Sequence, residues 1–302
     1  MSKTMPFLQS NDALAHPEEL RARMYRDGYL FFRALIDPDA IRDVRRDILT
    51  LCRDAGWLAE GSDLMEAVAA PEERHVEPEP DYMVVYDEVM KLESFHALAH
   101  DPAMLAMYRE LLGEEVLVHP RNIARIVFPQ NTKYTTPAHQ DFIHIQGTPE
   151  TFTSWIPLGD CPREFGSLSI LAGSHRRGLL PTHAAYGAGG RGVDTDGLGL
   201  TWAEGDFREG DFVVFHSHAV HRALPNTTPD RLRLSVDYRY QGVSQPVVEG
   251  SLLPHFARLS WDEIYAGWRS DRYRYYWDKL PLNVVPFDRG LYARLDEAKS
   301  GK

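Results

Sequence analysis

The first 115 residues carry apolar side chains at helical spacing. Ile41, Val44 and Ile48 recur every three or four positions, which places them on one face of a helix. Asp37-Pro38 precedes them, and this pair is typical of a helix start because aspartate caps free N–H groups and proline fits the first turn. Similar patterns predict helices over residues 17–26, 38–51 and 102–112 and a strand over residues 29–32.

The spacing of apolar residues changes after about residue 116. Short apolar stretches with many alternating positions follow one another, separated by glycine and proline, which is the pattern of strands in a sandwich or barrel. Helices of crossover length do not alternate with them, which argues against a doubly wound parallel sheet. The predicted strands cover residues 116–119, 123–128, 139–145, 152–158, 167–171, 211–216 and 231–240.

We predict one domain over residues 1–302 with three parts. Residues 1–115 form an N-terminal region of helices and a first strand, residues 116–244 form the β core, and residues 245–302 form a helical tail. The tail is rich in aromatic residues, so we expect one or two short helices that pack back on the core. Residues 58–82 are acidic and contain three prolines, which predicts an irregular excursion over the surface.

Composition narrows the range of partners. The chain has 302 residues and a formal net charge of −11, which argues against a broad surface for nucleic acid or anionic membranes. Its two cysteines give no disulfide framework, so a reducing cytoplasm is the expected location. No apolar stretch approaches the length of a membrane span. We expect a monomer or homodimer that acts on a small molecule.

Residues 187–192 match the glycine pattern of a dinucleotide-binding turn, but their context is wrong. That turn must follow a strand and open a helix, whereas the sequence after Gly192 has no helical period. We therefore interpret this segment, within a loop over residues 178–205, as a loop near the active site. It is either a substrate lid or a plain surface connection.

His139, Asp141 and His221 are the candidate metal ligands. In a strand, residues two apart project from the same face, so His139 and Asp141 can reach one metal ion while Gln140 points away. His-x-Asp alone is a weak signal, because such pairs arise often by chance. With His221 from a neighbouring strand, however, two imidazoles and one carboxylate form the ligand triad of non-haem Fe(II) oxygenases.

Motifs along most of the chain resemble those of the phytanoyl-CoA dioxygenase family of Fe(II)- and 2-oxoglutarate-dependent oxygenases. The resemblance implies a mainly β protein with flanking helices (α+β) whose core is a double-stranded β-helix, a cupin-like jelly roll. It assigns His139, Asp141 and His221 to iron, with 2-oxoglutarate as cosubstrate and O2 as oxidant. The motifs are, in order, residues 27–30, 139–141, 155–158, 166–175 and 210–216, followed by His221.

Other histidines compete for the ligand positions. His216 fits the Phe-His end of a family strand, and His218 lies in the following turn, so His221 is preferred as the distal ligand. His144 is a lesser candidate because in a strand it would lie on the face opposite Asp141. His175 is another, because it belongs to a Gly-Ser-His turn.

The distal carboxylate of 2-oxoglutarate needs a cation, and a guanidinium can bind it in bidentate fashion. Arg231 and Arg233 both lie near the position where the family places this arginine. Alignment on Ser235 favours Arg231, whereas the Arg-x-Ser pattern of related oxygenases favours Arg233, and Arg231 is the preferred prediction. Trp155 and Gln140 also match family positions near the cosubstrate.

The predicted reaction is hydroxylation of an unactivated C–H bond in a small metabolite, with release of succinate and CO2. Desaturation and cyclisation use the same cofactors and stay open. So do a cupin-like metal protein without 2-oxoglutarate turnover and a binding protein that keeps only the fold. We expect pocket walls from Asn122, Arg125, Tyr134 and the loop over residues 178–205.

Overall fold

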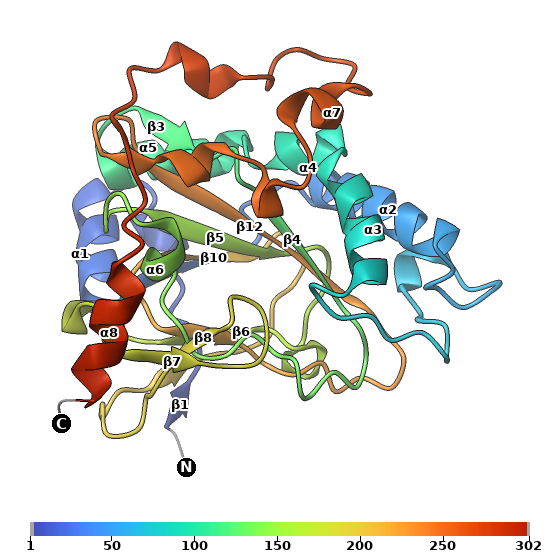
Figure 1. The fold of residues 1–302 in the computed structure, drawn as a ribbon, viewed down its shortest axis with the longest axis horizontal. Helices are drawn as coiled ribbons and strands as arrows, with labels where there is room; N and C mark the ends of the chain where they lie inside the picture. The colour runs from blue at the N-terminus through green and yellow to red at the C-terminus, as the bar shows by residue number, and fades with distance from the viewer. Residues whose placement is uncertain (1–2, 301–302) are drawn as a thin grey trace.

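The computed structural model describes residues 3–300 and shows two facing sheets with helices on the outside (Figure 1). The larger sheet has the strand order β2-β10-β5-β12-β3, and β4 also pairs with β12. The smaller sheet has the order β1-β9-β6-β11. Apart from the parallel β1–β9 pair, neighbouring strands of these two sheets are antiparallel. This is the predicted jelly roll.

The strands of the two sheets have the following bounds: β1 Thr4–Met5, β2 Tyr29–Phe32, β3 Val116–Val118, β4 Ile123–Val127, β5 Phe152–Pro157, β6 Leu168–Leu171, β9 Trp202–Ala203, β10 Phe212–His216, β11 His221–Ala223 and β12 Arg233–Gly242. Two small pairs complete the set: β7 Thr182–Ala184 with β8 Arg191–Val193, and β13 Val247–Val248 with β14 Val284–Val285. The helices are α1 Pro17–Asp27, α2 Pro38–Asp54, α3 Pro80–Met90, α4 Glu93–Leu98, α5 Pro102–Leu112, α6 Phe142–Ile145, α7 Trp261–Tyr265 and α8 Leu291–Ser300.

The predicted starts of α2 and α5 are confirmed by their caps. The Asp37 side chain accepts a hydrogen bond from the backbone N–H of Asp39, and Asp101 caps α5 in the same way. Gly28 and Gly113 end α1 and α5 in the left-handed conformation, which glycine adopts without steric penalty. Helices α3 and α4 were not predicted from the sequence.

The main hydrophobic core lies between the helices and the outer face of the larger sheet. Figure 1 shows α3, α4 and α5 on the side of β12 that faces away from β6. From β12, Leu234, Val236, Tyr238 and Tyr240 enter this core. A second apolar cluster lies between the two sheets and joins Trp155 and other residues of the larger sheet to the smaller one.

The prediction of a strand over residues 139–145 is wrong. His139 forms only an isolated antiparallel bridge with His221, and the chain then turns into the short helix α6. Asp141 already has helical backbone angles, with φ −63° and ψ −33°. A short apolar run such as residues 142–145 fits one helical turn as well as a strand, so its pattern did not distinguish them.

The terminal regions pack onto the same framework. Strands β1 and β2, from the predicted N-terminal region, pair with β9 and β10 of the two sheets. In the C-terminal tail, Trp261, Ile264 and Trp277 belong to the main core, as expected for a tail that packs back. The division into three parts within one domain stays a prediction. Among residues 3–300, no helix has both the length and the apolar composition of a membrane span.

The glycine-rich residues 187–190 form the tip of the β7–β8 hairpin, and strand β8 follows them directly where a dinucleotide-binding turn would open a helix. The hairpin tip closely approaches the segment before His139. A Cβ atom at Gly187 would lie only 2.2 Å from the Thr135 carbonyl oxygen. Helix α8 lies beside this hairpin and α6 (Figure 1), where the Tyr292 hydroxyl contacts Nδ1 of His144 at 3.2 Å.

Candidate metal centre and cosubstrate site

The two histidines of the triad are fixed to each other by their backbones. The N–H of each donates to the carbonyl oxygen of the other at 3.0 Å, and the ring centroids of His139 and His221 are 4.1 Å apart. Nε2 of His139 lies 3.4 Å from Oδ1 of Asp141, and Nε2 of His221 lies 3.6 Å from the same oxygen. Three potential ligand atoms therefore converge, although Asp141 lies at the start of a helical turn and not in a strand.

The hydrogen bonds of the rings fix which nitrogen is free to bind a metal ion. Nδ1 of His139 lies 2.8 Å from the Pro137 carbonyl oxygen, and Nδ1 of His221 lies 3.0 Å from the Ala219 carbonyl oxygen. A carbonyl only accepts, so Nδ1 carries the proton and the Nε2 lone pair faces Asp141. Burial, and then the neighbouring His139, lower the pKa of His221 to about 3, so its ring is neutral.

Asp141 is held through the oxygen that faces away from the histidines. Oδ2 accepts a hydrogen bond from Thr153 Oγ1 at 2.8 Å and from Arg239 Nη2 at 3.2 Å. Burial alone would raise the pKa of Asp141, but the charge of Arg239 holds this pKa well below its usual value. The carboxylate is therefore ionised and presents Oδ1 to the centre of the triad.

These residues fit a divalent metal ion. Among the described residues, His139, Asp141 and His221 form the one group of buried ligand-type side chains whose ligand atoms lie within 4.8 Å of one another. Two neutral imidazoles and one carboxylate oxygen are the donor set of non-haem iron sites. Thr153 and Arg239 were not among the predicted site residues, although Arg239 shares the inward face of β12 with Arg233.

The competing histidines lie elsewhere. Nε2 of His216 lies 3.6 Å from Oε1 of Glu150, and Nδ1 of His216 accepts a hydrogen bond from the backbone N–H of His218 at 3.0 Å. The His175 ring packs against His216. His144 lies closer to the triad, with its ring centroid 6.2 Å from that of His139, but it projects from α6 and not from a strand.

The two candidate arginines occupy different environments. The Arg231 side chain is 35% exposed and forms an ion pair with Glu66 at the surface. Arg233 is 4% exposed and lines a cavity together with the triad. Its Nη1 donates to Ser235 Oγ at 2.5 Å, whereas its buried Nε–H has no hydrogen-bond acceptor among residues 3–300. A buried guanidinium with an unused donor is suited to bind an anion.

Trp155 and Gln140 also differ in position. Trp155 lines the cavity, and the Arg233 guanidinium lies 5.8 Å from its ring centroid. Gln140 is fully buried outside the cavity wall, where its amide donates to the carbonyl oxygens of Gly178 and His218. The Gln140 side-chain oxygen accepts the N–H of Leu180. Gln140 thus ties neighbouring segments together.

Two small cavities meet at this site, each with a volume of about 50 Å³. The first, called the metal cavity, is lined by Arg125, Thr136, His139, Asp141, Trp155, Leu168, Phe215, His221, Ala223, Arg233, Asp237 and Arg239. The second, called the outer cavity, shares Arg125, Thr136, Ala223 and Arg233 with the first and extends toward residues 75–77, Tyr134 and Ala188. Arg125 and Tyr134 are thus wall residues, as predicted, whereas Asn122 contacts His96 instead.

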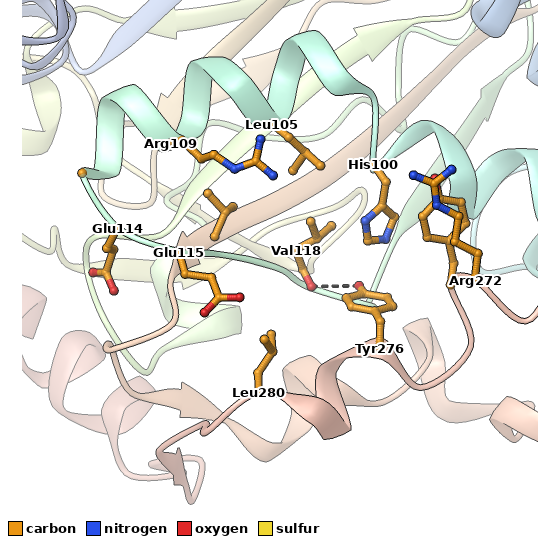
Figure 2. Close-up of a pocket in the computed structure, with 12 residues that line it drawn as sticks. His100, Leu105, Arg109, Glu114, Glu115, Val118, Arg272, Tyr276 and Leu280 are labelled. Atoms are coloured by element: carbon orange, nitrogen blue, oxygen red, sulfur yellow. Dashed lines mark hydrogen bonds between the residues drawn. The ribbon is translucent and has the colours of Figure 1, made fainter.

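A larger cavity lies outside the β core and contains none of the triad. It has a volume of about 700 Å³ and is bounded by α5, the edge strand β3 and residues 272–280 (Figure 2). The Tyr276 hydroxyl crosses it to the Val118 carbonyl oxygen at 2.8 Å. Cavity size therefore does not mark the place of chemistry in this protein.

Comparison with known proteins identifies the family of this chain. The family model for phytanoyl-CoA dioxygenase (PhyH) matches residues 24–234, which include the triad and Arg233. The chain belongs to this family. It is accordingly an enzyme, an Fe(II)- and 2-oxoglutarate-dependent oxygenase, as the resemblance implied.

Two curated relatives come from Streptomyces. The chain is 27% identical over 254 residues to the 1-deoxypentalenic acid 11-beta-hydroxylase of Streptomyces arenae, covering 79% of this chain and 84% of the relative. It is 30% identical over 158 residues to the ectoine dioxygenase of Streptomyces coelicolor, covering 50% of this chain and 48% of that enzyme. Among solved structures, the epimerase SnoN in complex with Fe3+, alpha ketoglutarate and nogalamycin RO has a TM-score of 0.54 at 20% identity, covering 77% of this chain and 86% of its own. This last likeness shows a shared fold.

Proposed function

We propose that this oxygenase hydroxylates an unactivated C–H bond of a small metabolite, with His139, Asp141 and His221 as its Fe(II) ligands. One observation carries the proposal: the triad and the buried Arg233, with an unused N–H donor, line the same cavity. When bound there, iron and 2-oxoglutarate supply the activation of O2, and succinate and CO2 are released.

The protein's own residues prepare the site in two ways. Thr153 and Arg239 occupy Oδ2 of Asp141, which leaves Oδ1 for the metal and favours binding through one oxygen. The apolar side chains of Trp155, Leu168 and Phe215 line the same cavity and exclude water from the reacting centre.

Arg233, and not the preferred Arg231, is the residue that we assign to the distal carboxylate of 2-oxoglutarate. Burial lowers the pKa of Arg233, which means that an anion beside it is needed to stabilise its charge. Arg231 already has Glu66 as its partner at the surface. Trp155 forms part of the cosubstrate wall, and Gln140 supports the loop that begins at Gly178.

The alternatives are weighed by the same contacts. Desaturation and cyclisation require the same ligands, and no contact in the cavity favours either over hydroxylation. A metal protein without 2-oxoglutarate, or a binding protein without turnover, leaves the buried Arg233 without a function. Cytoplasmic location belongs to the proposal and is supported by the buried thiols of Cys52 and Cys161, which form no disulfide. The monomer or homodimer state stays a prediction.

The test is to load the protein with Fe(II) and 2-oxoglutarate and measure succinate with and without O2 across a metabolite panel. We expect oxygen-dependent succinate and a product 16 mass units heavier than one of the substrates. His221→Ala should lower metal affinity at least about a hundredfold because one of three protein ligands is lost. His216→Ala is the matched control and should bind metal as the parent does. Absence of 2-oxoglutarate binding, or loss of metal in His216→Ala alone, contradicts the assignment.

A further inference from the structure

An ion pair lies where the metal cavity and the outer cavity share a wall residue. Arg125, on β4, lines both cavities, and its guanidinium pairs with the Glu77 carboxylate. On its other side, Nε of Arg125 lies 3.9 Å from Oδ2 of Asp237, on β12. Burial lowers the pKa of Arg125, but Glu77 and Asp237 more than offset this and raise it, so the guanidinium is charged.

The two partners of Arg125 belong to different parts of the protein. Asp237 is fixed by the antiparallel pairing of β12 with β4 and β5. Glu77 comes from residues 71–79, a segment with no helix or strand that crosses the outside of the barrel before α3. Glu77 is therefore the partner that can leave without breaking a sheet.

The charges that line the metal cavity leave a position for one more anion. Among the described residues of its wall, Arg125, Arg233 and Arg239 face Asp141 and Asp237, which leaves one positive charge in excess. The charges of Fe2+ and the dianionic cosubstrate cancel each other. Glu77 supplies the missing negative charge while the site is closed, and any group that replaces Glu77 must supply it in turn.

Both cavities are small, each about 50 Å³. The Glu77 carboxylate already occupies the position beside Arg125 where a second carboxylate would bind, so an acidic substrate must displace it. Residues 75–77 line the outer cavity next to the exposed Tyr134, and they carry the charge that Arg125 would exchange.

We propose that Arg125 is the substrate-recognition residue and that the substrate is an organic acid whose carboxylate takes the place of Glu77 on the guanidinium. The inference rests on the proposed function, since it assumes that the acid presents a C–H bond to the metal centre. A cationic substrate held by Glu77 is the opposite case. It would add a positive charge to a wall that already has an excess and would take Glu77 away from Arg125.

The test uses the full-length protein loaded with Mn(II) and 2-oxoglutarate without O2. The probes are phenylacetate, phenylacetamide and 2-phenylethylamine, and their binding is followed by paramagnetic relaxation of the ring protons. We expect phenylacetate to bind about tenfold more tightly than the amide, because only the acid forms a charged pair with Arg125. Glu77→Gln should increase phenylacetate affinity several-fold by removing the competitor, and Arg125→Gln should reduce it to the level of the amide.

Arg231→Gln is the matched control, because Arg231 also pairs with a glutamate but lies outside both cavities. It should leave the preference for the acid unchanged. Each variant is also titrated with 2-oxoglutarate. This binding reports folding, and it separates the proposed function from the inference that Arg125 binds an acidic substrate. If the parent protein binds no 2-oxoglutarate, the proposed function fails. If it does, four results would each overturn the inference alone. Two concern the probes: the amine binds most tightly, or phenylacetate binds neither the parent nor Glu77→Gln. Two concern Arg125→Gln: this variant still prefers the acid, or it no longer binds 2-oxoglutarate.

Discussion

The two faces of β12 show how one strand serves both the core and the active site. On the outer face, Leu234 and Val236 pack in the hydrophobic core, and the Tyr238 and Tyr240 hydroxyls donate to the carbonyl oxygens of Phe95 and Ala99. The inward face instead carries charged and polar residues that line the metal cavity: Arg233, Asp237 and Arg239, with Ser235 between them.

The difference between the faces shows where stability and chemistry reside. The outer face is stabilised by apolar burial and by hydroxyl groups that satisfy helix carbonyls. The inner face holds three charges within one strand, and Arg233 and Arg239 are buried, an arrangement that destabilises a fold unless each charge has a partner. Arg239 has Asp141 and Asp237 has Arg125, whereas Arg233 keeps one donor for a ligand. Substitutions on the two faces should therefore affect different measurements.

Leu234→Ala should produce the largest effect, and it should be on stability. Removing a fully buried leucine leaves a cavity in the main core, so the free energy of unfolding should fall by about 3 kcal/mol. Urea unfolding measures this change, and Leu8→Ala, at an exposed leucine, is the control. Affinity for 2-oxoglutarate should stay within about twofold, because β12 keeps its hydrogen-bonded register. A comparable loss of 2-oxoglutarate affinity would show that the faces are not independent.

Arg233→Gln should affect the binding of 2-oxoglutarate and not the stability of the fold. The dissociation constant for 2-oxoglutarate should rise about a hundredfold, equal to about 2.7 kcal/mol, because a buried charge-assisted contact is lost. Stability without ligand should not fall, because the variant removes a buried charge that lacks a full set of partners. Isothermal titration under nitrogen measures the binding. Arg231→Gln should remain near the parent value, and the reverse pattern would return the assignment to Arg231.

Arg239→Gln should have a smaller effect, confined to the metal. Asp141 keeps its hydrogen bond from Thr153 but loses the guanidinium that fixes Oδ2, so metal affinity should fall about tenfold. Thr153→Val tests the other support of Asp141. Equilibrium dialysis with Fe(II) under nitrogen measures both. At saturating metal, 2-oxoglutarate affinity should be unchanged, and a loss as large as that of Arg233→Gln would place Arg239 in the cosubstrate site instead.

Much of the framework could be predicted because it depends on local properties. Helix caps at Asp37 and Asp101 are properties of neighbouring residues, and they are confirmed. The strand predicted over residues 231–240 is observed as β12, Arg233–Gly242. The jelly roll followed from the succession of short strands and from the family motifs. The local pattern failed at residues 142–145, where one short apolar run satisfies two periods.

The choice between Arg231 and Arg233 required tertiary structure. The two residues share strand parity, but β12 begins at Arg233, where it pairs with Val127 of β4. Before that point, Arg231 forms an isolated bridge with Val68, and its side chain turns toward Glu66. The end of a strand depends on its partner, and no property of residues 231–233 alone reports that partner.

The sequence by itself determined the chemistry of this protein, because two histidines and one aspartate in family order require only side-chain identity and sequence position. The tertiary structure decided how that chemistry is supported and closed. It brought Arg239 and Thr153 to Asp141, placed Arg233 in the metal cavity and set Glu77 on Arg125. These contacts join segments far apart in the chain, so the packing of the sheets and loops forms them and no local pattern predicts them.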